Sequence, residues 1–251
     1  METIRSHSVA RRRLHPPSTR ADSPISVRAT AATPTRHLSW LAGGIILSFL
    51  VPYAFADRLG LPRDLYYGIY VAAVVGLCAG WMRDTGQSPR ELLARRWRWA
   101  VALGVLFAVA SVLLVVRTEN ATSHPGGIEF IGAIVWRGVV YGAADGLLLT
   151  AFPILVVFAA LSRGRLRRRR GGLVAVGAVA LGASLLLTAT YHLGYSDFRS
   201  AKVRKPMTGD LLWSPPTLAT LNPVGAPIVH AAMHVAAVTH SYETDLFLPP
   251  H

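Results

Sequence analysis

Apolar runs alternate with short polar links along most of the chain, and arginine is the commonest charged residue in the links. The runs lie at residues 38–56, 65–82, 99–116, 128–161 and 173–191, with a shorter one centred on 228–238. A bilayer core about 30 Å thick requires roughly 20 apolar residues in a helix. We therefore predict an all-α protein, a polytopic transmembrane helix bundle of about six spans that occupies residues 37–251.

The fourth run, residues 128–161, is too long for one perpendicular span. Its 34 residues would extend about 50 Å along a helix axis, against a bilayer core of about 30 Å. We expect this run either to tilt and kink at Gly142, Gly146 or Pro153, or to begin with a separate interfacial helix.

Four polar side chains in this run fall on one ridge of the predicted helix, each at a multiple of four residues from the next. They are Glu129, Arg137, Tyr141 and Asp145. A charged side chain near the bilayer centre costs roughly 2.5–3.5 kcal/mol. We therefore expect the ridge to face other helices or a water-filled cavity and to avoid lipid.

The composition supports the membrane assignment. The 251 residues are 52% hydrophobic and 16% charged, with a mean hydropathy of +0.38, a balance that is unusual for a soluble domain. The net charge of +13 comes from arginines beside the apolar runs, since Lys202 and Lys205 are the only lysines. That placement fits membrane topology better than a nucleic-acid surface, so we expect the lipid bilayer as a partner and no nucleic acid. The lone cysteine, Cys78, excludes a disulfide framework.

Three arginine-rich segments predict the orientation of the chain. Residues 1–36, 83–98 and 162–172 lie on the same side if every span crosses once. Under the positive-inside rule this side is cytoplasmic, so we expect an integral cell-membrane protein with both termini inside. Residues 1–36 are predicted to be a disordered basic tail, and the polar segment 191–222 an outer loop.

A capping-box pattern marks one short helix between two spans. Ser88, Pro89 and Glu91 provide an N-cap, a proline at the first helical position and an acidic residue in the first turn. We expect a basic helix here that lies on the membrane surface. It should contain Arg95, Arg96 and Arg98.

Three histidines in or beside the spans are candidates for chemistry. His230 and His234 share one face of the last span, and His192 ends the fifth. We expect them to meet Arg137 and a carboxylate, from Glu129 or Asp145, in one cavity near the outer side. Such a set could hold a divalent metal, with zinc the first choice by ligand type. The alternative is that the histidines hydrogen-bond to backbone carbonyls or to a tyrosine within the bundle.

Three sequence features, taken in order, resemble a known membrane family. Trp136-Arg137-Gly138 lies in an apolar helix, a later span ends in Tyr191-His192, and the last span contains His230-Ala231-Ala232-Met233-His234. Over about residues 128–240 this order resembles the CPBP family, the CAAX-protease and bacteriocin-processing-like intramembrane proteins. The resemblance implies an intramembrane protease with a membrane-embedded peptide substrate.

Individual residues match the motifs of that family. Arg137 corresponds to its motif arginine, His192 to its middle histidine and His230 to the histidine of its last helix. His234 replaces the usual Asn or Asp. The glutamate pair that the family uses to activate water corresponds to Gly132-Ala133 and is therefore missing here.

Two functions remain open from the sequence. The first is a CPBP-like membrane hydrolase. Its catalytic residues would be Glu129 or Asp145, Arg137, His192 and His230, and its metal ligands His192, His230 and His234. A carboxylate would act as a substitute base, with Arg137 orienting it or holding a substrate carboxylate. The second function is a non-enzymatic membrane scaffold, or a protein that handles small solutes or ions, and a bis-histidine haem site is a weaker third idea.

Overall fold

The computed structural model describes residues 32–161 and 170–248. Within these residues every regular element is a helix, which confirms the all-α prediction, and five helices are long and apolar enough to cross a membrane. They are α1 with its π-helical end η1 (Pro34–Val51 and Pro52–Arg58), α2 (Arg63–Thr85), α4 (Trp97–Thr118), the composite helix Gly127–Leu161, and α9 (Arg170–Leu193). Residues 1–31 of the predicted basic tail lie outside the described residues, as do residues 162–169 of the third arginine-rich segment.

Six shorter helices accompany the five long ones in the described ranges. They are α3 (Pro89–Ala94), η4 (Ser196–Phe198), η5 (Ala201–Val203), α10 (Arg204–Trp213), α11 (Pro215–Thr220) and α12 (Gly225–His240). The last of these corresponds to the sixth predicted span. With 16 residues, it is shorter than the roughly 20 that a perpendicular span requires.

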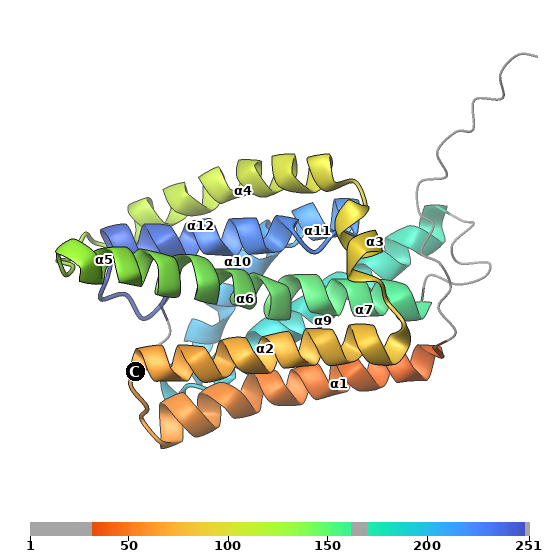
Figure 1. The fold of residues 1–251 in the computed structure, drawn as a ribbon, viewed down its shortest axis with the longest axis horizontal. Coiled ribbons are helices and arrows are strands. Elements are labelled where there is room, and N and C mark those ends of the chain that lie inside the picture. The colour runs from red at the N-terminus through yellow and green to blue at the C-terminus, as the bar shows by residue number, and fades with distance from the viewer. Residues whose placement is uncertain (1–31, 162–169, 249–251) are drawn as a thin grey trace, which may run out of the picture.

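The composite helix is the centre of the bundle. It joins α5 (Gly127–Ala133), η2 (Ile134–Tyr141), α6 (Gly142–Asp145), η3 (Gly146–Ala151) and α7 (Phe152–Leu161). Its most apolar window is 89% buried, against 22–33% for the other four long helices. Figure 1 shows it between α4 and α12 on one side and α2 and α1 on the other. The outer helices instead expose apolar side chains such as Ile46, Leu106 and Val174, a surface suited to lipid.

The alternative of a separate interfacial helix is wrong. The chain stays helical through Gly142, Gly146 and Pro153, and the helix is continuous from Gly127 to Leu161 in the described chain. Two π-helical stretches, η2 and η3, absorb the irregularity. A π turn holds more residues than an α turn, so the residue spacing changes locally along the helix. Asp145 lies in the middle of the composite helix and is buried, whereas Glu129 lies in its first turn and is exposed.

The last helix runs in the direction opposite to the prediction. Just before α12 begins, Asn222 Nδ2 donates hydrogen bonds to the carbonyl oxygens of Leu93 and Arg95, at 2.8 and 2.6 Å. At the other end of α12, the backbone N–H of Thr122 donates to the carbonyl of His240. The end of the described chain therefore lies at the opposite end of the bundle from the start of α1 (Figure 1), which contradicts the expectation that both termini share one side.

The reversal arises because the segment 191–222 is not an outer loop. α10 packs against α9, and α11 packs against α4, so this segment carries the chain back along the bundle. Ser214 and the adjacent prolines Pro215 and Pro216 divide the passage into two short helices. Neither piece is long enough to look like a span in the sequence.

The short helix α3 begins as predicted, with the Ser88 hydroxyl accepting from the backbone N–H of Glu91. It ends earlier than predicted, at Ala94. The three arginines expected within it lie beyond its end: Arg95, Arg96 and Arg98. Arg96 has a left-handed φ of 38°, and its guanidinium donates to the carbonyl of Ala219, which connects this turn to α11.

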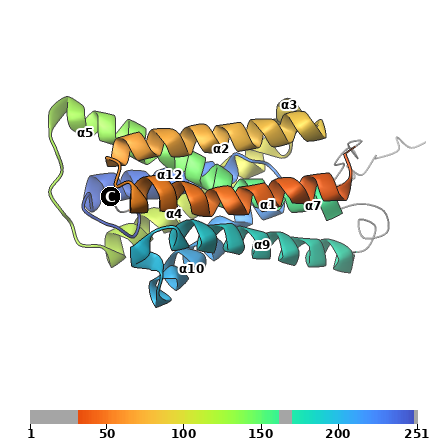
Figure 2. The same ribbon diagram turned by 90° about the horizontal axis from the view of Figure 1, so that it is seen from below.

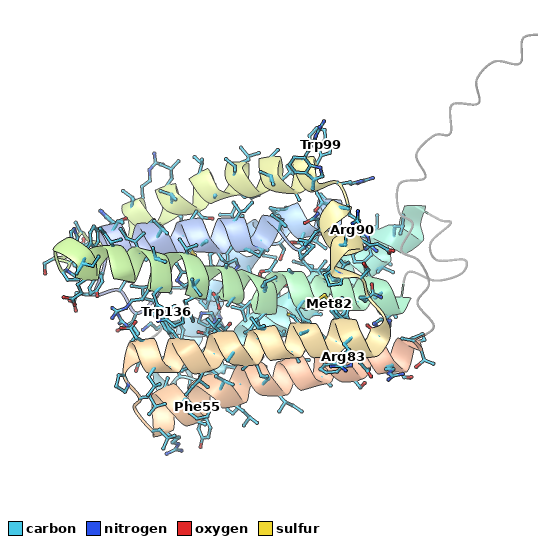
Figure 3. The ribbon with its side chains drawn as sticks, in the orientation of Figure 1. Phe55, Met82, Arg83, Arg90, Trp99 and Trp136 are labelled. Carbon is cyan, nitrogen blue, oxygen red and sulfur yellow. The ribbon has the colours of Figure 1, made fainter. Side chains whose placement is uncertain are left out.

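Several arginine-bearing helix ends lie at one end of the bundle, although others, such as Arg58, Arg63 and Arg117, lie at the opposite end. Arg36 at the start of α1 forms an ion pair with Asp84 near the end of α2. Figure 3 shows Arg83, Arg90 and Trp99 toward the same end, and Figure 2 shows the end of α7 and the start of α9 there as well. The cytoplasmic location of this end stays a prediction.

Candidate functional site

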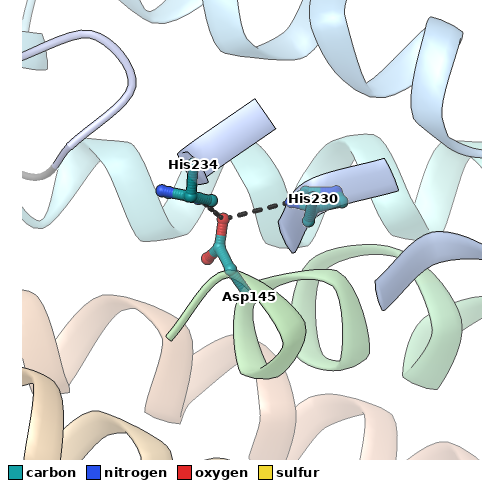
Figure 4. A group of neighbouring side chains, drawn as sticks. All are labelled: Asp145, His230 and His234. Carbon is teal, nitrogen blue, oxygen red and sulfur yellow. Dashed lines mark hydrogen bonds and ion pairs between the residues drawn. The ribbon is translucent and has the colours of Figure 1, made fainter. Parts of the chain in front are cut away.

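Three polar side chains that are distant in the sequence meet inside the bundle (Figure 4). Asp145 Oδ2 lies 3.2 Å from His230 Nδ1 and 3.3 Å from His234 Nε2. All three side chains are buried, and one ligand atom from each lies within 4.8 Å of the others. We refer to Asp145, His230 and His234 as the Asp–His–His cluster.

Glycines on the composite helix allow α12 to approach closely enough to form this cluster. A Cβ atom at Gly146 would lie 2.8 Å from the carbonyl group of Ala226, and one at Gly142 would lie 2.9 Å from the Cα of Ala231. Gly138 faces α12 in the same way. Small residues at four-residue spacing are typical of close helix contacts in membranes. Two of the expected kink sites are therefore the surface on which α12 packs.

A second buried carboxylate lies beyond His230, on α10. His230 Nε2 is 3.3 Å from Thr150 Oγ1, and the Thr150 hydroxyl donates to Asp210 Oδ1 at 2.9 Å. The other oxygen of Asp210 accepts from Ser184 Oγ at 2.8 Å. A continuous chain of polar contacts therefore leads from Asp145 through His230 and Thr150 to Asp210.

Phenol side chains enclose Asp145 on the side away from the histidines. Tyr70 donates its hydroxyl to Asp145 Oδ1 at 2.9 Å. The hydroxyls of four further tyrosines hydrogen-bond to one another nearby: Tyr66, Tyr141, Tyr191 and Tyr195. Because Tyr70 occupies Oδ1, the Oδ2 atom is the one that Asp145 presents to the two histidines.

A cavity of about 620 Å³ is lined by Asp145 and His234. Much of its wall is apolar or aromatic, formed by residues that include Leu114, Leu149, Phe198, Leu212, Trp213 and Met233. Arg204, Lys205 and Asp245 also line it and are exposed, so the cavity reaches the surface near the start of α10. The Asp–His–His cluster is thus buried and yet adjacent to a space that could admit a ligand.

His192 lines the same cavity but does not belong to the cluster. Its Nδ1 atom lies 2.7 Å from the carbonyl oxygen of Thr188. A carbonyl oxygen can only accept, so Nδ1 carries the hydrogen, and Nε2 of the neutral ring carries the lone pair. Of the three predicted histidine ligands, the structure brings two together, and Asp145 completes the group in place of His192.

Arg137 and Glu129 lie away from the cluster, which corrects the expected convergence. The guanidinium of Arg137 donates to both carboxylate oxygens of Asp64, at 2.8 and 2.7 Å, and to the hydroxyl of Tyr242. Glu129 is exposed in the first turn of α5. Among the described residues that line the cavity, neither is present. Separation along the helix axis accounts for this, since at 1.5 Å per residue Arg137 and Glu129 come roughly 12 and 24 Å before Asp145.

The sequence analysis missed Asp210, Thr150 and Tyr70. The apolar residues Leu211, Leu212 and Trp213 directly after Asp210 were the available signal, because a solvated loop rarely carries three large apolar side chains in succession. Thr150 and Tyr70 gave no such signal, since an isolated hydroxyl in an apolar helix is commonplace and can bond to its own backbone.

The donor atoms of the cluster could hold a divalent metal. Zinc bonds of about 2.0–2.2 Å in tetrahedral geometry place neighbouring donor atoms roughly 3.3–3.6 Å apart. The two distances from Asp145 Oδ2, at 3.2 and 3.3 Å, are close to this separation. One carboxylate and two imidazoles would leave a coordination position open, which is typical of catalytic zinc sites and not of structural ones.

The comparisons with known proteins add no family: no family model, no curated protein and no solved structure matches the chain. The resemblance to the CPBP family therefore rests on the sequence features alone, and the function is argued below from the geometry of the site.

Proposed function

We propose that this chain is a membrane-embedded, metal-dependent hydrolase that resembles the CPBP intramembrane proteases. The observation that supports it is the burial of an aspartate and two histidines together, beside a cavity that reaches the surface. Ionisable groups inside a membrane are costly and usually mark a functional site. The resemblance supplies the substrate class, a peptide embedded in the membrane.

Asp145, His230 and His234 would hold the metal, and zinc suits this mixture of oxygen and nitrogen ligands. A bound zinc ion would polarise a carbonyl group of the substrate as a Lewis acid. His192 presents the lone pair of Nε2 from the cavity wall and would accept a proton there. Tyr141 also lines the cavity, and its hydroxyl would have to leave its hydrogen bond with Tyr191 to donate to a developing negative charge.

A non-enzymatic role as a membrane scaffold or an ion- or solute-handling protein is the second candidate. Two observations favour it. Gly132 and Ala133 occupy the positions of the family's glutamate pair, and Glu129, one turn earlier, is exposed outside the cavity. A protein that only binds metal needs the Asp–His–His cluster but not a base.

Metal content separates these functions from a purely structural cluster. Elemental analysis of detergent-purified protein should find about one zinc per chain in the wild type. The His230→Ala/His234→Ala double variant should lose it, whereas His124→Ala, which alters an exposed histidine far from the cluster, should retain it. A metal-free wild type whose folding is unharmed by the double change would contradict the metal site.

Activity then separates the two proposed functions. Zinc-loaded protein in lipid nanodiscs would be incubated with fluorogenic peptides that carry a hydrophobic segment. The hydrolase is supported if cleavage requires zinc and is lost in the His192→Ala variant. Zinc binding without cleavage of any peptide would instead favour the non-enzymatic role.

A further inference from the structure

Asp210 has no part in the roles assigned so far, although it is fully buried at the centre of a hydroxyl cluster. Its Oδ1 atom accepts from Thr150 at 2.9 Å, and its Oδ2 atom accepts from Ser184 at 2.8 Å. A third hydroxyl, that of Ser214, lies 3.4 Å from Oδ1. A buried carboxylate is costly to maintain unless donors satisfy it, and here the protein supplies hydroxyls from η3, from α9 and from the junction between α10 and α11.

The hydrogen atoms of this cluster determine the state of His230. A threonine hydroxyl has a single hydrogen, and Thr150 gives it to Asp210. Its oxygen can then only accept from His230 Nε2, which lies 3.3 Å away. His230 therefore carries its hydrogen on Nε2, and the lone pair of the neutral ring is on Nδ1.

That lone pair points at another acceptor. Nδ1 of His230 lies 3.2 Å from Asp145 Oδ2, which also faces Nε2 of His234 at 3.3 Å. A ring lone pair opposite a carboxylate oxygen is unfavourable, so in metal-free protein the contacts on Nε2 must offset this repulsion, and a cation between the two atoms would remove it. The arrangement thus fits a metal ion better than it fits a hydrogen bond.

We propose that Asp210 is a positioning residue that acts through Thr150 to hold His230 in the Nε2–H tautomer, so that Nδ1 is available as a ligand. The inference rests on the proposed metal site and extends it beyond its three ligands. Metal-binding histidines commonly donate their second N–H to a carboxylate, and loss of that partner typically weakens metal affinity 10–100-fold. In this chain the Thr150 hydroxyl is interposed between ring and carboxylate.

Three single variants separate positioning from packing. Thr150→Val keeps the shape of the side chain and removes the hydroxyl that connects Asp210 to His230, which we call the relay. Asp210→Asn keeps the size of the carboxylate but adds an N–H₂ group that can face Thr150, so that the threonine hydrogen turns toward His230. Ser184→Ala removes a different donor from the same carboxylate and leaves the relay intact, and is the matched control.

The first measurement is the tautomer of His230 in metal-free protein. Long-range proton–nitrogen NMR spectra of histidine-labelled protein would be recorded at about pH 8, above the ordinary histidine pKa of about 6.5. The wild type and Ser184→Ala should show the hydrogen of His230 on Nε2, and Thr150→Val should show a mixture of tautomers. A hydrogen on Nδ1 in the wild type, as the other tautomer or as imidazolium, would overturn the proposal.

The second measurement is the zinc dissociation constant, obtained by competition with a chromophoric chelator. Thr150→Val and Asp210→Asn should weaken binding roughly 10–100-fold, whereas Ser184→Ala should change it less than about threefold. Unchanged affinity in both relay variants would refute the positioning role. If the wild type bound no zinc at all, the proposed metal site would fail, and the NMR result would still decide whether Asp210 sets the tautomer.

Discussion

Arg137 and Asp145 are two charged residues on one helix, eight positions apart, and they have opposite surroundings. Arg137 lies near the surface of the bundle with 17% of its side chain exposed, and it pairs with Asp64, whose side chain is 53% exposed. Asp145 is 5% exposed and contacts His230, His234 and Tyr70.

The difference lies in what each charge faces. Arg137 forms an ion pair with Asp64 and donates a hydrogen bond to the Tyr242 hydroxyl, and in each contact a donor faces an acceptor. These contacts of Arg137 are therefore satisfied without a ligand. Asp145 presents one oxygen to two imidazole nitrogens, and a cation would complete that arrangement. Burial of a charge alone therefore does not mark the site. What marks the site is a set of buried ionisable groups that converge on one point.

The largest expected effect comes from removal of the central carboxylate. Asp145→Ala should abolish zinc binding and should destabilise the zinc-loaded fold by about 3–5 kcal/mol, because the metal loses its carboxylate ligand and the buried Tyr70 hydroxyl loses its acceptor. The measurement is zinc content together with denaturant unfolding in detergent. Retention of zinc by this variant would show that the cluster does not hold the metal.

A smaller effect is expected from the glycines that bring α12 over Asp145. Gly146→Ala places a Cβ atom 2.8 Å from the backbone of Ala226, so one of the two helices must move, at a cost of about 1–3 kcal/mol. We expect lower thermal stability and weaker zinc binding.

The matched control is Gly132→Ala on the same helix, where a Cβ atom would meet nothing within 4 Å among the described residues. That change should be neutral or slightly stabilising, since alanine favours a helix by about 1 kcal/mol over glycine. Equal losses in both variants would show that helix propensity, and not the contact with α12, governs this face.

Much of the bundle was predictable because a long apolar run in a membrane forms a helix, which satisfies its own backbone hydrogen bonds. The five long helices follow from run length alone. The path of residues 191–222 was not predictable in this way, since Ser214, Pro215 and Pro216 divide it into pieces too short to register as a span. That misreading also reversed α12, because the direction of each helix depends on the count of crossings before it.

The candidate site was predictable in part for a related reason. The four-residue spacing of His230 and His234 places both on one face of any helix, whatever its neighbours. The partner of that face depends on how far along the composite helix α12 crosses it, which buries Asp145 and leaves Glu129, in the first turn, exposed. The position of Asp210 near His230 depends on the path of residues 191–222, which the sequence analysis took for an outer loop. Local periodicity therefore identified the two histidines on one helix but not which carboxylates meet them.

The smallest effect is expected from Arg137, the second of the two charged residues compared above. Arg137→Met keeps the length and apolar stem of the side chain and removes its pairing with Asp64. Because that carboxylate is more than half exposed, water can replace the arginine, and the loss of stability should be no more than about 1 kcal/mol. Zinc affinity should stay within about twofold of the wild type, since Arg137 is outside the Asp–His–His cluster. Denaturant unfolding in detergent measures the stability, and competition with a chelator measures the zinc affinity. A large loss of zinc affinity with little loss of stability would mean that Arg137 acts on the site, as the family resemblance implies. Arg137 and Asp145 would then share one function and differ only in their distance from the bound metal.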